Sequence, residues 1–195
     1  MINLQVINIF WKVKDKQGNN FLKKITKKIG ILGGTFDPPH VGHLHISNIA
    51  IKKFKLRNIV WIITKQNPLK QKPYLSKNMR IKLSKDIIKK QKKISLKYLD
   101  DVVRSKNTFD LLNYFKKHKK KSELFFLIGA DNLINLHKWN NWKKIPRLAK
   151  IVVFARPNYS NKALNSVAAK KLKKSDWIYV NSKKMNISSS LIRKF

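Results

Sequence analysis

Two histidines, His40 and His43, stand three residues apart at the end of a glycine- and proline-containing segment. An apolar run precedes this segment, and a helix-like pattern follows it from Leu44. Gly33 and Gly34 let the backbone approach a ligand without a Cβ in the way. Because the N–H groups at the start of a helix attract anions, this arrangement predicts a phosphate-binding turn. Both imidazoles could point at one bound anion.

A second segment with similar potential lies near the end of the chain, Ile187-Ser188-Ser189-Ser190-Leu191-Ile192-Arg193. Ser188 can cap a terminal helix, and Arg193 adds a planar, positively charged fork one turn later. Taken alone, the pattern is that of an ordinary serine-capped helix. Together with the histidine segment, it predicts a second helix start that faces phosphate.

The histidine segment, Gly33-Gly34-Thr35-Phe36-Asp37-Pro38-Pro39-His40-Val41-Gly42-His43-Leu44, resembles the signature of the HxGH nucleotidyltransferases. The form with GGTFDP before HxGH is most similar to bacterial nicotinate-nucleotide adenylyltransferases. The C-terminal segment resembles the ISSTxIR motif of that family, with Ser190 where threonine is usual. Twelve patterned residues between a strand and a helix make an incidental turn a poor explanation.

The middle of the chain extends the resemblance. Gly129-Ala130-Asp131 is similar to the family's strand–GAD–helix segment, and Trp139 and Trp142 to its WxxW-like stretch. Ala155-Arg156-Pro157-Asn158-Tyr159 resembles its ARPGY turn. Asn158 replaces the usual glycine, and asparagine tolerates the same left-handed backbone. The resemblance therefore spans roughly residues 28–195.

The elements that must position these motifs alternate along the chain. Apolar runs typical of buried parallel strands occur at 28–32, 59–63, 94–98, 124–128, 151–154 and 177–180. Helix-like stretches occupy 42–54, 78–90, 108–118, 141–148 and 189–194. The alternation predicts an α/β fold, a Rossmann-like open parallel sheet with helices on both faces. The glycine turn and the GAD turn should then meet beyond the carboxyl ends of the strands, at the switch point.

The domain organisation predicted for the 195 residues is a nucleotidyltransferase domain over 28–195, preceded by an extension at 1–27. Phe10, Trp11, Phe21 and Leu22 in the extension could pack, but Gly18-Asn19-Asn20 interrupts them. This region is either a family-specific extension or the result of a start codon placed too early.

Composition limits the classes of function. The chain has no cysteine, which excludes thiol catalysis and thiolate metal sites. No apolar run approaches the length of a membrane span and no signal peptide is recognisable, so a cytoplasmic location is expected. The net charge is +36, yet only six of the 45 basic residues are arginine. A specific nucleic-acid surface would use more arginine, so we interpret the abundance of lysine as a composition bias. The resulting positive field would attract nucleotides and bind RNA weakly.

The activity implied by the resemblance is transfer of the adenylyl group of ATP to nicotinate mononucleotide. An ionised phosphate needs no general base, so catalysis would rest on positioning and charge stabilisation. Mg²⁺ would be held mainly by ATP oxygens and water. By resemblance, His40, His43 and Arg193 act at the reacting phosphates. The implied ATP-binding residues are Gly33, Gly34, Thr35, Phe36, Gly42, Ala130, Asp131, Ile187, Ser188 and Ser189.

The segments that would bind the acceptor match the family's motifs less closely. Trp139 occupies the position of the indole that stacks on the pyridine ring in the family, although core packing is the competing explanation. Thr108 and Asp110 match the family's YTxDT segment, but Asn107 and Leu111 depart from it. The remaining implied substrate-binding residues are Asn67, Lys70 and Arg156.

Two other functions stay open at this point. Phosphopantetheine adenylyltransferases share HxGH and a serine-rich C-terminal motif, but a pantetheine arm needs no stacking indole. A basic RNA-binding protein with a vestigial nucleotide fold would fit the charge, but the chain lacks interleaved surface aromatics. A homo-oligomer is compatible with the sequence under each of the three functions.

Overall fold

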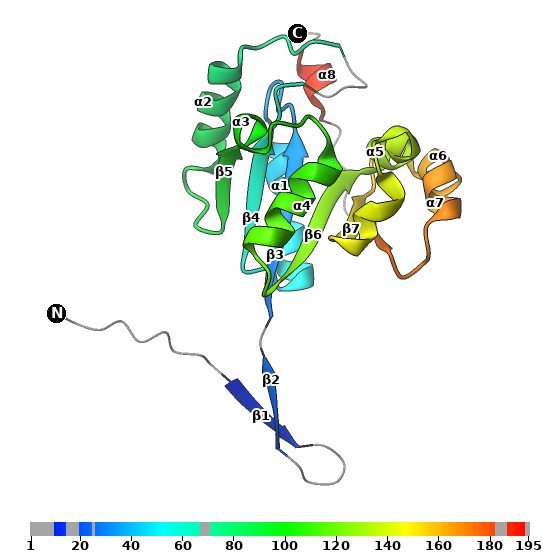
Figure 1. Ribbon diagram of the computed structural model, residues 1–195. Coiled ribbons are helices and arrows are strands. Elements are labelled where there is room, and N and C mark those ends of the chain that lie inside the picture. Colours follow the sequence, from blue (N-terminus) through cyan, green and yellow to red (C-terminus); the bar gives the residue numbers. More distant parts are fainter. Residues whose placement is uncertain (1–9, 15–19, 25, 67–70, 182–186, 194–195) are drawn as a thin grey trace, which may run out of the picture.

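The computed structural model describes residues 10–14, 20–24, 26–66, 71–181 and 187–193. Its centre is a six-stranded, all-parallel sheet (Figure 1). The strand order is β5-β4-β3-β6-β7-β8, which places β3 (Lys27–Gly34) beside β6 (Ser122–Gly129). The other strands are β4 (Asn58–Ile63), β5 (Ile94–Tyr98), β7 (Lys150–Phe154) and β8 (Trp177–Val180). All six predicted strands are therefore present, and the open parallel sheet is confirmed.

Helices cover both faces of the sheet, because the four central strands β3, β4, β6 and β7 bury residues on both sides. On one face α1 (Val41–Phe54) and α2 (Lys77–Ile88) bury Ala50 and Ile88 against Trp61 and its neighbours in the strands. On the other face α4 (Thr108–His118) and α5 (Ala130–Asn135) pack over a second buried cluster. The predicted helices at 42–54, 78–90 and 108–118 agree with α1, α2 and α4 to within two residues.

The predicted helix at 141–148 is wrong in type. Trp142–Arg147 forms a 3₁₀ helix, η2. Another short 3₁₀ helix, η1 (Leu136–Lys138), precedes it. Pro146 lies inside η2, where it lacks the N–H that an α-helix would use. The sequence also gave no sign of the short helices α3 (Asp100–Val103), α6 (Ser160–Leu164) and α7 (Val167–Lys171). The terminal helix α8 (Ser189–Ile192) is shorter than the 189–194 expected.

The first part of the chain contains an antiparallel pair, β1 (Phe10–Lys14) and β2 (Asn20–Lys24). Figure 1 shows this hairpin apart from the six-stranded sheet, beyond the amino end of β3. Asn20, the last residue of the expected interruption at Gly18-Asn19-Asn20, begins β2, while Gly18 and Asn19 lie outside the described residues. Within the described ranges no helix has the length and apolarity that crossing a membrane requires.

Candidate functional site

The two histidines cap the helix that they introduce. His40 is the N-cap of α1, and its Nδ1 accepts a hydrogen bond from the Gly42 N–H at 3.1 Å. His43 reaches back, and its Nδ1 accepts from the His40 N–H at 3.2 Å. The two rings lie with their centroids 3.9 Å apart. The arrangement is a capping box made by imidazoles instead of the usual serine and glutamate.

This capping fixes the tautomer of both rings. A ring nitrogen that accepts a hydrogen bond carries no proton, so the proton of each neutral imidazole must be on Nε2. Burial and, as a smaller effect, the positive charge of Arg156 together lower the pKa of His40 to about 4. His40 is therefore neutral near pH 7. Each histidine can then donate an Nε2–H to a phosphate oxygen.

The glycine between the histidines is required by close packing. A Cβ at Gly42 would stand 2.8 Å from Nδ1 of His40 and 3.1 Å from the Ile187 side chain. A side chain here would displace the capping imidazole. At Gly33, by contrast, no atom of the described residues lies within 4 Å of the place a Cβ would take. The end of β3 thus borders open space, where a ligand can approach the backbone.

Aromatic side chains pack against the ring of His43. Phe36 is 2% exposed, and its ring centroid lies 4.8 Å from that of His43 and 5.0 Å from that of Trp61. The indole N–H of Trp61 donates to the Ser47 hydroxyl at 2.9 Å, which in turn donates to the carbonyl of His43 at 2.8 Å. The side chain of Phe36 is therefore core, and only its backbone can line a nucleotide pocket.

The C-terminal segment docks onto the same loop, as the two motifs predict. Ser188 caps α8, accepting from the Leu191 N–H at 3.1 Å, which confirms the predicted cap. The Ser189 hydroxyl donates to the carbonyl of Pro38 at 2.8 Å. The Arg193 guanidinium donates to the carbonyl of Asp37 and lies 3.5 Å from its carboxylate. More than 150 residues of sequence separate these partners.

Two residues that carry this geometry were not among the predicted site residues. Asp37, 5% exposed, accepts from the N–H groups of Tyr74 and Leu75, both at 2.8 Å. Arg80, 2% exposed, donates to the carbonyl of Thr35 at 2.6 Å. One signal in the sequence could have found Arg80. In a chain with 45 basic residues and only six arginines, an arginine is a candidate for a position that needs a planar fork of donors.

The GAD turn meets the ARPNY turn beside the histidines. Asp131, at the start of α5, pairs with Arg156 at 2.7 Å, and the effect of Arg156 on the pKa of His40 places its charge near the first imidazole. One carboxylate oxygen of Asp131 is buried and has no hydrogen-bond partner among the described residues. Ala130 is 0% exposed, so in this structure it offers no surface to adenosine, and its predicted place in the ATP site stays a prediction.

Three of the predicted acceptor residues, Thr108, Asp110 and Trp139, lie on the other face of the sheet from α1. Thr108 and Asp110 are in the first turn of α4, and Asp110 accepts from the Ser105 hydroxyl at 2.6 Å and from the Asn107 amide at 3.4 Å. Trp139 is half-buried, with its ring edge toward Phe126 at 6.2 Å between centroids. Asp110 thus holds the turn before α4, and Trp139 both packs on the core and keeps an exposed part.

Comparison with known proteins decides the family. Residues 31–195 match the family described as cytidylyltransferase-like. A protein of Pelagibacter ubique (strain HTCC1062) named "Probable nicotinate-nucleotide adenylyltransferase" is 49% identical over 179 residues, covering 92% of this chain and 98% of that protein. The chain belongs to the nicotinate-nucleotide adenylyltransferase family. A relative with the same name from Clostridium tetani is 35% identical across 86% of both chains.

The fold agrees with this membership. A structure described as Plasmodium falciparum nicotinic acid mononucleotide adenylyltransferase complexed with NaAD superposes with a TM-score of 0.70. It is 24% identical and covers 87% of this chain and 83% of its own. The resemblance drawn from the sequence motifs is confirmed, and of the three functions considered it favours the first.

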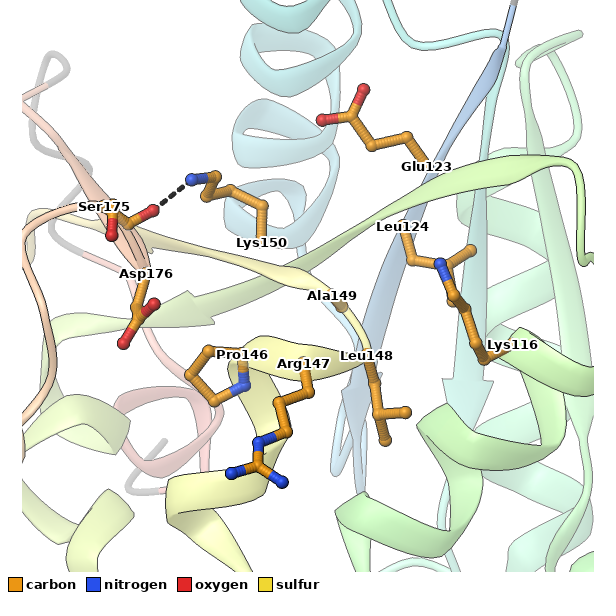
Figure 2. Close-up of a pocket in the computed structure, with 10 residues that line it drawn as sticks. All are labelled: Lys116, Glu123, Leu124, Pro146, Arg147, Leu148, Ala149, Lys150, Ser175 and Asp176. Atoms are coloured by element: carbon orange, nitrogen blue, oxygen red, sulfur yellow. Dashed lines mark hydrogen bonds between the residues drawn. The ribbon is translucent and has the colours of Figure 1, made fainter.

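The cavities of this nicotinate-nucleotide adenylyltransferase family member do not coincide with its motifs. Figure 2 shows a cavity of about 280 Å³ at the amino ends of the strands, lined by Glu123, Lys150 and Asp176 among others. A larger one, about 600 Å³, lies between the starts of β3 to β5 and the end of α4. Neither is lined by a predicted site residue, and we assign the chemistry by the donors at the carboxyl edge. Predicted residues Asn67 and Lys70 lie outside the described residues.

Proposed function

We propose that the chain transfers the adenylyl group of ATP to nicotinate mononucleotide, releasing pyrophosphate and forming nicotinate adenine dinucleotide. The observation that carries the proposal is the histidine pair. Both Nδ1 atoms accept from backbone N–H groups, so each ring in its neutral form carries its proton on Nε2, at one helix start. Such preorganised donors stabilise charge that develops on a phosphate during the reaction.

The donors and the chemistry match. The mononucleotide phosphate is already an anion and attacks the α-phosphorus of ATP directly, while the bond to the β-phosphate oxygen breaks. No proton has to be removed from the nucleophile, so neutral donors are more useful here than a base. In this proposal His40 and His43 hold phosphate oxygens in line for the attack, and the backbone at Gly33 admits the nucleotide.

The C-terminal segment supplies the second half of the phosphate site. Arg193 is 35% exposed at its side chain, so part of its fork remains accessible while Asp37 holds one edge. Together with the N–H groups at the start of α8, it would bind the outgoing pyrophosphate. Among the described residues no cluster of three or more acidic or histidine side chains is suited to a metal ion. In this proposal ATP arrives as its magnesium complex, with the ion held mainly by ATP oxygens and water.

The acceptor would cross the edge of the sheet toward α4 and Trp139. The indole of Trp139 would stack on the pyridine ring, and backbone N–H groups near Thr108 would receive its carboxylate. A site of donors favours the acid, because the amide of nicotinamide mononucleotide would place N–H against N–H. Two buried donors without acceptors cost about 1–3 kcal/mol.

Pyrophosphate release at fixed MgATP tests this function with three acceptors: nicotinate mononucleotide, its amide, and phosphopantetheine. We expect the acid to have the highest kcat/KM, roughly 5- to 150-fold above the amide, which corresponds to that cost. Phosphopantetheine should support no turnover. Equal or better kcat/KM for the amide would overturn the acceptor assignment, and turnover with phosphopantetheine alone would overturn the function.

A further inference from the structure

Arg80 is a buried arginine in α2 that belongs to none of the motifs. Its guanidinium donates to four backbone carbonyls. Nη1 reaches Thr35 at 2.6 Å and Thr64 at 2.8 Å, Nη2 reaches Lys65 at 3.3 Å, and Nε reaches Leu75 at 3.2 Å.

The four carbonyls come from three segments that meet at the carboxyl edge of the sheet. Thr35 directly follows β3, in the turn that leads to the histidines. Thr64 and Lys65 follow β4, and Leu75 precedes α2. One side chain therefore ties the turn of the first motif to the ends of the neighbouring connection.

Asp37 joins the same segments from the opposite direction. Its carboxylate accepts from the N–H groups of Tyr74 and Leu75 and lies beside Arg193. Burial lowers the pKa of Arg80, and the negative charge of Asp37 is the largest effect that opposes this. Leu75 is thus held by both, its N–H by Asp37 and its carbonyl by Arg80.

Only a planar fork fits these acceptors. A guanidinium presents five N–H donors in fixed directions, whereas an ammonium is a compact group with three. Lysine is the common cation of this chain, with arginine at only six positions. A lysine at position 80 could reach some of the four carbonyls and would leave others unpaired.

We propose that Arg80 is a positioning residue, which holds the Thr35 carbonyl and so keeps the turn between β3 and the histidines in the shape that receives ATP. The inference rests on the proposed function. Arg80 itself touches neither substrate. Its loss should weaken ATP binding and turnover in molecules that are still folded.

The test compares Arg80→Met and Arg80→Lys with a control, Ile88→Ala, which destabilises the same helix at its far end. Melting temperature, the KM values of both substrates, kcat, and the Kd of a non-hydrolysable ATP analogue are measured for each. We expect Arg80→Met to weaken analogue binding and lower kcat/KM for ATP by about tenfold or more. Arg80→Lys should recover part of both, and Ile88→Ala should change only the melting temperature.

A purely structural role predicts a different result. Analogue affinity and kcat/KM within twofold of wild type in folded Arg80→Met would overturn the proposal, as would equal kinetic losses in Ile88→Ala. If Arg80→Met does not fold, Arg80→Lys decides by the same criteria. Failure of the proposed function is distinguishable, since the wild-type chain would then show no turnover with nicotinate mononucleotide, whereas failure of this inference leaves wild-type turnover intact.

Discussion

The two edges of the sheet differ in how they are built. At the carboxyl edge, side chains bond to backbone far away in sequence, as Ser189 does with Pro38 and Arg80 with Thr35. At the amino edge lie two cavities, and the one of about 600 Å³ has Lys27, Arg57, Lys97, Lys117 and Lys119–Lys121 in its lining. No acidic side chain is in that lining, within the part of the chain that the structure describes.

This difference indicates that the size and the charge of a cavity do not identify where phosphate is bound for reaction. A phosphate-binding site needs donors held in fixed directions, and those come from capped helix starts and clamped turns. Flexible lysines around an open groove raise the local concentration of any anion without orienting it. We therefore expect the reaction at the carboxyl edge, and from the amino edge only a contribution to the electrostatic field.

The largest expected effect is that of a mutation at the carboxyl edge. His43→Ala removes one preorganised donor and should lower kcat by roughly 10²-fold or more. Its backbone partner, the His40 N–H, remains at the helix start. Pyrophosphate release by folded protein measures the loss. Near-wild-type turnover would remove the histidine pair from the mechanism.

The matched change at the amino edge is Lys119→Glu, Lys120→Glu and Lys121→Glu in one chain. This lowers the net charge by six without touching a motif, and we expect kcat/KM within about twofold of wild type at moderate salt, where surface fields are screened. A loss as large as that of His43→Ala would show that the basic groove takes part in the reaction.

A smaller effect concerns His40 and pH. Its folded pKa of about 4 is below the ordinary 6.5, so between these values the unfolded chain binds a proton that the folded chain does not. The free energy of unfolding should therefore decrease as the pH is lowered from 6.5 to 4. Above pH 6.5, His40 should make it no more dependent on pH. His40→Asn keeps a capping acceptor for Gly42 and removes the titration.

Melting temperatures at pH 7.5 and pH 5.0 check this for wild type and His40→Asn. The melting temperature of the wild type should decrease more than that of the variant, by about 2–4 °C for each kcal/mol that the titration of His40 contributes to unfolding. Equal decreases would mean that His40 titrates normally in the folded chain.

The sequence predicted what depends on local pattern. All six strands were found because each is a buried apolar run, and the cap at Ser188 because serine before a helix has one usual role. What it missed depends on contacts between distant segments. The carboxylate of Asp37 binds amides at positions 74 and 75, and nothing local to Asp37 indicates those partners.

The error at η2 has a local cause. The apolar spacing of this stretch suggests an α-helix, but Pro146 lies inside it and Trp142–Arg147 forms a 3₁₀ helix. Asp110 accepts from the Ser105 hydroxyl in this structure, and its role at the acceptor stays a prediction. Three of the six arginines, Arg80, Arg156 and Arg193, lie at the carboxyl edge, which only the fold shows.

Hydrogen–deuterium exchange with a non-hydrolysable ATP analogue tests the contrast between the edges most directly. Bound nucleotide should protect backbone amides at 33–43 and 187–193, where the turn after β3 and the start of α8 offer their N–H groups. Amides at 115–122, beside the basic groove, should exchange as in the free protein. Protection at 115–122 with none at 33–43 would contradict the assignment and place the nucleotide at the amino edge.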